Sequence, residues 1–312
     1  MRILMLGIEC HHITLRHFAE HTLAYASPEE KHAVDQEARE RFGNAGVTLY
    51  DSLDEALREF RPELAVIGVP NIRKNRFDIE RRLISQGIPI LEYKLRLSDI
   101  GSLRDFLREP ALDSVPVYIG EPYVYTPCVL QLHKEMENWA LGEPEYLRWR
   151  CVLGGGAYGW MQHYEHLSLE DLGLHHFSVL HFLFGLADAS VVSRSLSPSK
   201  GEGMTGTVCD SWLSWPNGFA ATHGIDWINA VDETDYLGTI ALECTRGAAL
   251  IRGEKLYMGQ WGEPMQEIAP TVEADPLAEM VALLTEGKTP RYMKSIRDFA
   301  PVMEKIDGAL RG

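Results

Sequence analysis

The chain has 312 residues, a length that suits two domains of about 120 and 190 residues better than one ordinary core. Its 30 basic and 45 acidic side chains leave a net charge of −15, without a basic stripe or an Arg/Lys cluster. We therefore expect binding neither to nucleic acid nor to an anionic membrane, and a small molecule is the expected substrate.

The cysteines are five in number and scattered, and none stands in a C-x-x-C spacing. They predict neither a disulfide framework nor a zinc ribbon, so a reducing, cytoplasmic location is expected. The apolar start reaches Glu9 without a cleavage-like site and is expected to be a first strand, not a signal peptide. No apolar run is long enough to predict a membrane span.

From residue 2 to residue 118, short apolar runs alternate with amphipathic stretches. The apolar runs predict strands at Ile3–Gly7, Thr22–Ala26, Leu64–Val69, Ile88–Leu91 and Val115–Ile119. The amphipathic stretches predict helices at 13–20, 29–42, 52–60, 74–86 and 99–109. Buried strands joined by helical crossovers predict a Rossmann-like, doubly wound parallel sheet, which binds ligands at the carboxyl ends of its strands.

After about residue 120 the pattern changes, which predicts a first domain over 1–120 and a second over 121–312. A helix near 127–140 and an extended segment at 145–153 precede the Gly154–Gly156 turn. Alternating segments then predict strands at 189–196, 205–214, 218–227, 236–244 and 248–252. A closing helix at about 291–309 should be interrupted at Pro301. The predicted fold class is α/β, with a C-terminal α+β domain on a large, mostly antiparallel sheet.

Asp171 and His175 stand four residues apart in a run that predicts a helix, so their side chains point the same way. An imidazole beside a carboxylate that can orient it suits proton transfer during catalysis. Lys94, at the end of an apolar strand, is a second candidate. In an arbitrary chain these residues would more often be a helix-start carboxylate, a core histidine and a solvated lysine.

The ordering of these segments resembles the Gfo/Idh/MocA family, which includes glucose-fructose oxidoreductase and inositol dehydrogenase, and the resemblance covers nearly the whole chain. It is carried by YDSLDEAL (50–57), PELAVIGVPN (62–71), LISQGIPILEYKL (83–95), GEPYVYTP (120–127), WALGEPEYLR (139–148), DLGLHHFSVLHFLFG (171–185) and LTEGKTPRYMKSIRDF (284–299). The resemblance implies that Lys94, Asp171 and His175 are catalytic and line a cleft where a nicotinamide ring meets a substrate alcohol or ketone. Lys94 and His175 would handle the proton, and Asp171 would hold the substrate hydroxyls or orient the other two.

The same resemblance implies a set of residues that contact the cofactor, NAD or NADP: Gly7, Ile8, Ser27, Val69, Pro70, Asn71 and Tyr93. Substrate contacts are expected from Tyr123, Trp160, His163 and His176, because aromatic and imidazole groups gather where a ring-shaped polar ligand binds. The same residues would also serve packing between two domains.

The first loop departs from the dinucleotide fingerprint G-x-G-x-x-G, because Gly7-Ile8-Glu9-Cys10-His11-His12 keeps one glycine of three. A carboxylate at Glu9 about 5 Å from a pyrophosphate charge would cost about 3 kcal/mol, or roughly a hundredfold in affinity, if it pointed inward. Ser27 replaces the acidic residue expected after the second strand, which leaves the choice between NAD and NADP open. The cofactor could also be absent.

Two further groups of residues admit more than one interpretation. Cys10 and the histidines around it could bind a metal or offset Glu9 beside a phosphate-bearing ligand, but their spacing matches no known metal site, and we expect none. Strands carrying Trp212, Trp215 and Trp227 predict an exposed sheet face. We expect this face to pair subunits in a homo-oligomer, a dimer or a tetramer.

Three functions follow as hypotheses. The first is an NAD(P)-dependent oxidoreductase acting on a hydroxyl or carbonyl of a sugar, cyclitol or similar polar metabolite. The second is a non-redox acid/base enzyme, such as a dehydratase, lyase or isomerase, in the same cleft. The third is a non-catalytic ligand-binding or scaffold protein, since a fold does not guarantee its chemistry.

Overall fold

The computed structural model describes residues 1–7, 18–27, 33–68, 76–93, 100–138, 141–154, 164–196, 206–227 and 233–311. The chain divides into two compact units. Unit 1 comprises residues 1–122 and 275–300, and unit 2 comprises residues 123–274 and 301–312.

Unit 1 is built on a seven-stranded sheet in the order β15-β6-β5-β4-β1-β2-β3. Its strands are β1 (Arg2–Leu6), β2 (Thr22–Ala26), β3 (Thr48–Tyr50), β4 (Leu64–Ile67), β5 (Ile90–Glu92), β6 (Val117–Ile119) and β15 (Lys294–Ser295). Neighbouring strands from β1 to β6 are parallel, and β15 is antiparallel to β6. Because β1 lies between β2 and β4, the strand order reverses beside β1, which is the switch point of a doubly wound sheet.

The central strands of this sheet, β1, β4 and β5, are buried on both faces, as expected for parallel strands joined by helices. Ile3, Leu4, Met5 and Leu6 of β1 are fully buried, and so is every residue of β4. The helices of unit 1 are α1 (Ala33–Asn44), α2 (Leu53–Glu59), α3 (Arg76–Ser85), α4 (Ile100–Phe106), the 3₁₀ turn η2 (Pro110–Asp113), α7 (Pro276–Glu286) and the start of α8 (Ile296–Arg311).

The expected domain boundary needs one correction, because residues 275–300 belong to unit 1. Lys294 and Ser295 of β15 pair with Ile119 and Tyr118 of β6, which adds an antiparallel edge strand to the first sheet. Pro276, the first residue of α7, packs so closely on Gly120 that a Cβ added there would approach it to 2.5 Å. A contact between segments more than 150 residues apart leaves no local mark in the sequence.

Unit 2 is built on an eight-stranded sheet in the order β14-β13-β12-β11-β7-β10-β9-β8. Its strands are β7 (Pro144–Val152), β8 (Ser190–Leu196), β9 (Val208–Ser214), β10 (Ala220–Asp226), β11 (Thr239–Cys244), β12 (Gly247–Arg252), β13 (Lys255–Gln260) and β14 (Gln266–Ile268). Only β7 and β10 pair in parallel among these described strands. The fold class predicted from the sequence is confirmed: a doubly wound parallel sheet and a large, mostly antiparallel sheet.

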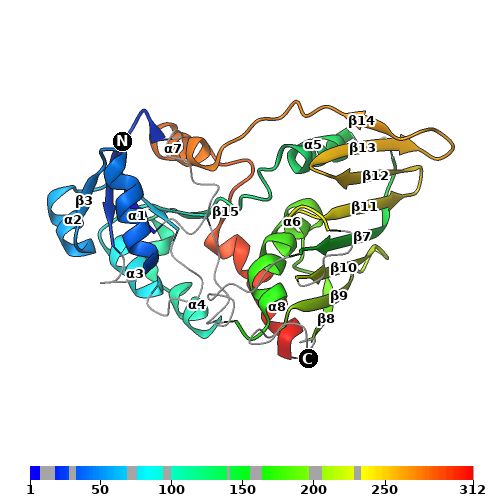
Figure 1. Ribbon diagram of the computed structural model, residues 1–312, viewed down its shortest axis with the longest axis horizontal. Coiled ribbons are helices and arrows are strands. Elements are labelled where there is room, and N and C mark those ends of the chain that lie inside the picture. The colour runs from blue at the N-terminus through cyan, green and yellow to red at the C-terminus, as the bar shows by residue number, and fades with distance from the viewer. Residues whose placement is uncertain are drawn as a thin grey trace. The chain divides into compact units, whose positions relative to one another are not determined.

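Helices of unit 2 pack on one face of its sheet: α5 (Pro127–Asn138), the π-helical segment η4 (Ser168–Gly173) and α6 (Leu174–Phe184) (Figure 1). In β9, Cys209, Ser211 and Leu213 are buried, whereas Asp210 and Trp212 are exposed. Side chains alternate across a strand, so Asp210 and Trp212 mark the other face of the sheet. Within the described residues, this face is open to solvent, and we call it the open face.

Helix α8 runs without a break from Ile296 to Arg311 and contains Pro301, where the sequence predicted an interruption. Proline removes one hydrogen bond of the helix. Phe299, Val302 and Ile306 on either side are buried, and their packing outweighs that loss.

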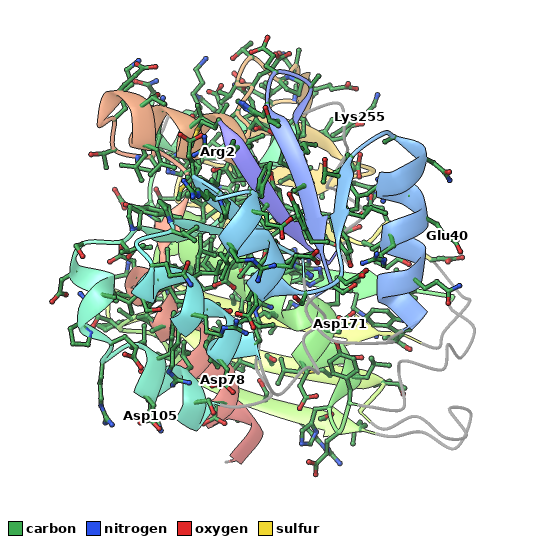
Figure 2. All side chains as sticks on the ribbon, turned by 90° about the vertical axis from the view of Figure 1, so that its left-hand side faces the viewer. Arg2, Glu40, Asp78, Asp105, Asp171 and Lys255 are labelled. Atoms are coloured by element: carbon green, nitrogen blue, oxygen red, sulfur yellow. The ribbon has the colours of Figure 1, made fainter. Side chains whose placement is uncertain are left out.

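Many charged side chains of unit 1 project into solvent. Glu40 of α1, Asp78 of α3 and Asp105 of α4 are exposed on the outer sides of their helices (Figure 2). Among the described residues, none of the helices combines the length and the apolar character needed to cross a membrane.

Candidate functional site

Asp171 and His175 lie at the junction of two helical forms. The chain is π-helical over Ser168–Gly173 and becomes α-helical at Leu174, so Asp171 belongs to η4 and His175 to the first turn of α6. Both side chains are buried, with 6% and 7% of their surface exposed. Single π-helical turns occur frequently at functional sites, because the extra residue displaces side chains from their regular positions.

The start of η4 is tied to the chain before β9. The Ser168 amide donates to the carbonyl oxygen of Gly206 at 2.8 Å, and the Ser168 hydroxyl donates to the carbonyl oxygen of Thr207 at 2.5 Å. Gly206 has a φ of +61°, and a Cβ there would approach the Cα of His166 to 2.4 Å. The π-helical segment is therefore held from outside its own helix.

Asp171 accepts a hydrogen bond from a buried tyrosine. The hydroxyl of Tyr164 donates to Asp171 Oδ1 at 3.3 Å. Tyr164 is one of the aromatic and imidazole residues that cluster ahead of the Asp171–His175 pair in the sequence. A buried carboxylate needs such donors, because burial without them penalises its charge.

His175 contacts Tyr123, the first residue of unit 2. Their ring centroids are 4.7 Å apart, with the planes tilted by 31°. The structure thus brings Tyr123, Asp171 and His175 into one region of unit 2, with the tyrosine ring packed on the imidazole. A ligand that reached His175 would meet an aromatic surface beside a potential base.

His176, predicted as a substrate contact, has both ring nitrogens engaged within the protein. Its Nδ1 lies 2.9 Å from His223 Nε2, and its Nε2 lies 2.9 Å from the carbonyl oxygen of Tyr236. The side chain is fully buried, so a hydrogen bond to substrate would require one of these contacts to break. The predicted contact of His176 with a substrate stays a prediction.

Three residues expected to contact a cofactor lie at the carboxyl edge of the first sheet. Gly7 follows β1 with a φ of +76°, Ser27 follows β2, and Tyr93 follows β5. Next to Gly7, the Gly68 amide after β4 donates to the carbonyl oxygen of Leu6 at 2.8 Å. The described residues at this edge fit a dinucleotide, because a left-handed glycine turns the chain at the switch point where such ligands bind.

A buried ion cluster joins β5 to α3 at the same edge. The guanidinium of Arg76 bonds to Glu80 at 2.9 Å and also to Glu92, and all three side chains are buried. Burial alone would lower the pKa of Arg76, but attraction from Glu92 and Glu80 outweighs it and raises that pKa above its ordinary value. This cluster fixes the end of the strand that leads to Tyr93 and Lys94.

Seven of the predicted site residues fall outside the described residues, and their predictions stand as made: Lys94, Ile8, Val69, Pro70, Asn71, Trp160 and His163.

The described cysteines take no part in the chemistry of this site. Burial raises the pKa of the Cys128, Cys151 and Cys244 thiols to about 12 and that of Cys209 to about 11. A thiol that stays protonated is a poor nucleophile and a poor metal ligand. Among the described residues, no three His, Cys, Asp or Glu side chains are grouped so as to hold a metal ion.

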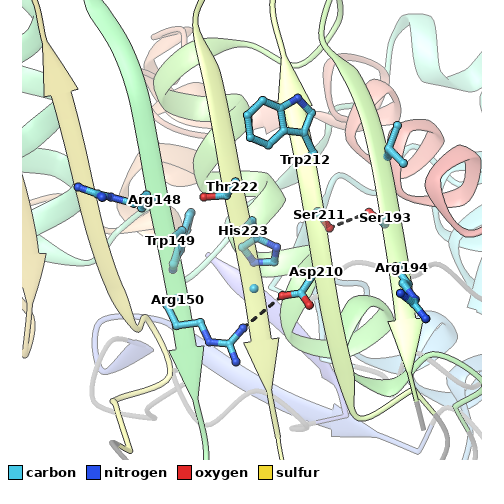
Figure 3. A pocket seen from close by; sticks show the side chains of 12 residues that line it. Arg148, Trp149, Arg150, Ser193, Arg194, Asp210, Ser211, Trp212, Thr222 and His223 are labelled. Atoms are coloured by element: carbon cyan, nitrogen blue, oxygen red, sulfur yellow. Dashed lines mark hydrogen bonds and ion pairs between the residues drawn. The ribbon is translucent and has the colours of Figure 1, made fainter.

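The open face of the second sheet carries a shallow depression of about 600 Å³ (Figure 3). Its side chains include Arg148, Arg150, Arg194 and Trp212, and Arg150 pairs with Asp210 at 3.2 Å across the strands. On the helix side of the same sheet, His176 contacts Trp149 and His223, and Tyr123 contacts His176. Trp149 and His223 belong to the lining of the depression as well, and their side chains are buried.

Comparison with known proteins shows the fold. No protein-family model matches the chain, and no curated protein matches it. Solved structures match over the whole length. An oxidoreductase from Agrobacterium radiobacter, in complex with NAD+, L-tartaric acid and magnesium, superposes with a TM-score of 0.83 and 13% identity, covering 99% of this chain and 95% of that one.

Two sugar-active enzymes show the same architecture. An aldose-aldose oxidoreductase from Caulobacter crescentus, complexed with glycerol, has a TM-score of 0.82 and 14% identity, covering 100% of this chain and 96% of that one. The UDP-N-acetylglucosamine 3-dehydrogenase GnnA from Acidithiobacillus ferrooxidans has a TM-score of 0.76 and 14% identity, with 99% and 96% covered. Identity this low establishes a common fold and leaves the reaction to be argued from the site.

Proposed function

We propose that the chain is an NAD(P)-dependent oxidoreductase of the Gfo/Idh/MocA type, acting on a hydroxyl or carbonyl of a sugar, cyclitol or similar polar small molecule. The observation that carries this proposal is the buried pair Asp171 and His175, supported by Tyr164 and Tyr123, on a chain whose other sheet has the dinucleotide-binding strand order. The full-length similarity to solved oxidoreductases supports it.

In this proposal His175 takes the proton of the substrate hydroxyl during oxidation and returns it during reduction, together with Lys94. Asp171, held by the Tyr164 hydroxyl, accepts hydrogen bonds from neighbouring substrate hydroxyls. NAD or NADP, when bound, supplies the hydride acceptor or donor. Gly7, Ile8, Ser27, Val69, Pro70, Asn71 and Tyr93 would hold it, while Tyr123, Trp160 and His163 would contact the substrate.

Titration of the purified protein with NADH and NADPH, followed by nicotinamide fluorescence, tests the cofactor. Saturable binding of either one is expected, and absence of binding by both at millimolar concentration would end the oxidoreductase proposal. A panel of sugars and cyclitols with the preferred cofactor then tests turnover.

The role of His175 is tested in the same assay with His175→Ala. We expect turnover to fall at least about a hundredfold, the usual contribution of a positioned acid or base. His181→Ala is the matched control, because His181 lies on the same helix and its Nδ1 accepts from the Leu186 amide at 3.2 Å. It should stay within a few-fold of the original turnover.

A second candidate function is favoured by Glu9, which stands where the dinucleotide fingerprint has its second glycine. A non-redox acid/base enzyme would keep Asp171 and His175 and dispense with hydride transfer. Turnover of a polyol or sugar acid without any nicotinamide, lost in His175→Ala, would favour it. Turnover that depends strictly on added NAD or NADP would exclude it.

We also propose that the protein is a homo-oligomer, a dimer or tetramer that pairs through the open face of the second sheet. Val192, Leu196 and Trp212 on edge strand β8 and its neighbour β9 expose 69%, 37% and 49% of their surface. Light scattering after gel filtration should give a multiple of the 35.2 kDa chain mass, and Trp212→Asp should give the monomer.

Met265→Asp serves as the control for this test, because Met265 is also exposed but stands just before β14, at the opposite edge of the sheet from β8. It should leave the oligomer intact. A monomer in the unsubstituted protein would refute the proposed assembly.

We also propose a cytoplasmic location, as the sequence predicts, since the described cysteines are free thiols.

A further inference from the structure

The interior of unit 2 contains a histidine pair that the proposed reaction does not use. His176 lies on α6, next to His175, and His223 lies on β10 with its side chain on the helix-facing side of the sheet. Both side chains are buried, and His176 Nδ1 lies 2.9 Å from His223 Nε2. The rings meet almost at right angles, with an angle of 87° between their planes.

The third member of this arrangement determines where the protons are. The Tyr236 carbonyl oxygen accepts hydrogen bonds only, so His176 Nε2, 2.9 Å away, carries a proton. A neutral His176 then has a lone pair on Nδ1, which accepts from a protonated Nε2 of His223. The hydrogen bonds therefore run in one direction, from His223 through His176 to Tyr236.

The pair is neutral for a physical reason. Burial, with the positive charge of Arg150 nearby, lowers the pKa of His223 to about 3. Burial and the neighbouring imidazole hold the pKa of His176 well below its ordinary value. Trp149 stacks on His176 at 4.3 Å and meets His223 edge-on at 5.7 Å, which surrounds the pair with apolar surface.

This pair is not what packing alone would select. Among the described residues, His223 Nδ1 has no hydrogen-bond partner, and a buried polar atom left in that state destabilises the fold. Two apolar side chains of similar size would avoid this loss. A polar group kept in a core at such a cost calls for a role other than stability.

The position of Tyr236 points to that role. Residues 233–238 form a loop in which the Thr234 amide donates to the Val152 carbonyl at 2.8 Å. In the same loop, Glu233 Oε1 accepts from the Gly154 amide at 3.1 Å. In the sequence, Gly154 precedes the predicted substrate residues Trp160 and His163. The hydrogen bond from His176 to Tyr236 therefore links the helix of His175 to the loop that holds Gly154.

We propose that His176 and His223 are positioning residues, whose directional hydrogen bonds to Tyr236 hold His175 on α6 and the 233–238 loop in one fixed arrangement. Tyr123 belongs to the same assembly, since its ring lies 4.7 Å from His175 and 6.1 Å from His176. The proposal rests on the proposed function only in treating His175 as the proton-handling group.

The tautomers are the first test, and they need neither substrate nor cofactor. In protein with ¹⁵N-labelled histidine, nitrogen–proton correlation spectra assign which ring nitrogen carries the proton. His176 and His223 should both be protonated at Nε2 alone, and both should stay so from pH 5 to pH 8, where an ordinary histidine titrates. A proton on Nδ1 of either ring, or titration of either ring in that range, would overturn the proposal.

The second test separates positioning from stability. His223→Leu removes the donor to His176, whereas His223→Gln keeps an N–H donor at this place. We expect the ring chemical shifts of His175, followed by the same spectra, to change in His223→Leu and to stay in place in His223→Gln. Leu147→Ala is the control, because Leu147 is fully buried in neighbouring strand β7 and its side chain makes no hydrogen bond to the pair.

Unchanged ring chemical shifts of His175 in folded His223→Leu would refute the proposal, and so would an equal change in Leu147→Ala. If His223→Leu does not fold, the tautomers of the unsubstituted protein and the His175 ring shifts in His223→Gln still decide it. Failure to bind NADH would refute the proposed oxidoreductase and leave these results untouched, so the two ideas can fail separately.

Discussion

A single hydroxyl group distinguishes Asp171 from an ordinary helix-start carboxylate. The Tyr164 hydroxyl donates to Asp171 Oδ1 at 3.3 Å, and both side chains are buried. We predict that Tyr164→Phe destabilises the fold by about 1–3 kcal/mol, because the carboxylate loses a buried donor. Turnover should fall more than substrate affinity does, since a misplaced Asp171 affects the reacting geometry. Urea unfolding and steady-state kinetics measure both effects.

Tyr146→Phe is the matched control for that prediction. The hydroxyl of Tyr146 bonds to Thr222 at 3.1 Å in a partly buried position, so the same atom is removed from another tyrosine of unit 2. It should cost less than about 1 kcal/mol and leave turnover unchanged. Equal kinetic losses in the two variants would show that Tyr164 has no special relation to Asp171.

Arg76 is a buried cation of unit 1. It bonds two buried carboxylates, Glu80 and Glu92. We predict that Arg76→Met lowers the free energy of unfolding by about 3–5 kcal/mol, because the carboxylates stay buried without their counterion. Arg81→Met, which breaks partly exposed pairs with Asp78 and Glu109, should cost about 1 kcal/mol or less. Similar losses measured by urea unfolding would contradict this account.

Residue-level prediction from the sequence used local signals and missed distant partners. Asp171 and His175 were predicted as site residues because they stand four positions apart in a helical run. The partners of the buried groups come from far along the chain: Glu92 is 16 residues from Arg76, and His223 is 47 residues from His176. A histidine at an inward position of a strand, such as His223 between Ala221 and Ile225, is the one signal that could have pointed to the pair.

At the scale of elements, hydrophobic patterning predicted most strands and helices but not their finer form. The strand predicted at Thr22–Ala26 is found with the same bounds. Helix α7 was not predicted, although Asp275 caps its first turn and Gly287 ends it in the left-handed conformation. The π-helical form of Ser168–Gly173 was also not predicted, because its cause lies in contacts with Gly206 and Thr207.

Gly206→Ala tests whether those contacts hold η4 in place. The substitution combines a left-handed φ of +61° with a Cβ 2.4 Å from the Cα of His166. Gly218→Ala, with a φ of +91° and no atom within 4 Å of its Cβ, isolates the backbone part of the effect. We predict that Gly206→Ala costs about 1–3 kcal/mol more than Gly218→Ala, measured by urea unfolding. Equal losses would mean that the close approach at His166 is easily relieved.

For the whole molecule, the order of elements predicted two units. It did not predict that a segment near the end of the chain belongs to the first unit. The change of pattern near residue 120 reflects a real change of architecture, from a parallel sheet to a mostly antiparallel one. Residues 275–300 return to unit 1 because β15 completes the edge of its sheet beside β6. Such a pairing is decided by the tertiary structure, and a two-residue strand has no hydrophobic pattern of its own to predict it.

The stability of the whole fold should fall in mild acid because of the buried histidine pair. An unfolded histidine gains a proton below a pKa of about 6.5, whereas folded His223 resists protonation until about pH 3 and His176 is also held well below its ordinary pKa. Between these limits the unfolded chain binds more protons, so the free energy of unfolding decreases as the pH falls. Each histidine contributes a slope of about 1.4 kcal/mol per pH unit, so the pair contributes up to about 3 kcal/mol per pH unit.

Urea unfolding at pH 7.5, 6.5, 5.5 and 4.5 measures this slope for the unsubstituted protein and for His223→Leu. The variant has lost one of the two depressed groups, so its stability should decline less steeply below pH 6.5, by about 1.4 kcal/mol per pH unit. His181→Ala serves as the control, because the same number of histidines is removed without touching the pair. If the slope is the same in all three proteins, acid destabilisation has another source, and the buried pair is not held neutral by the fold.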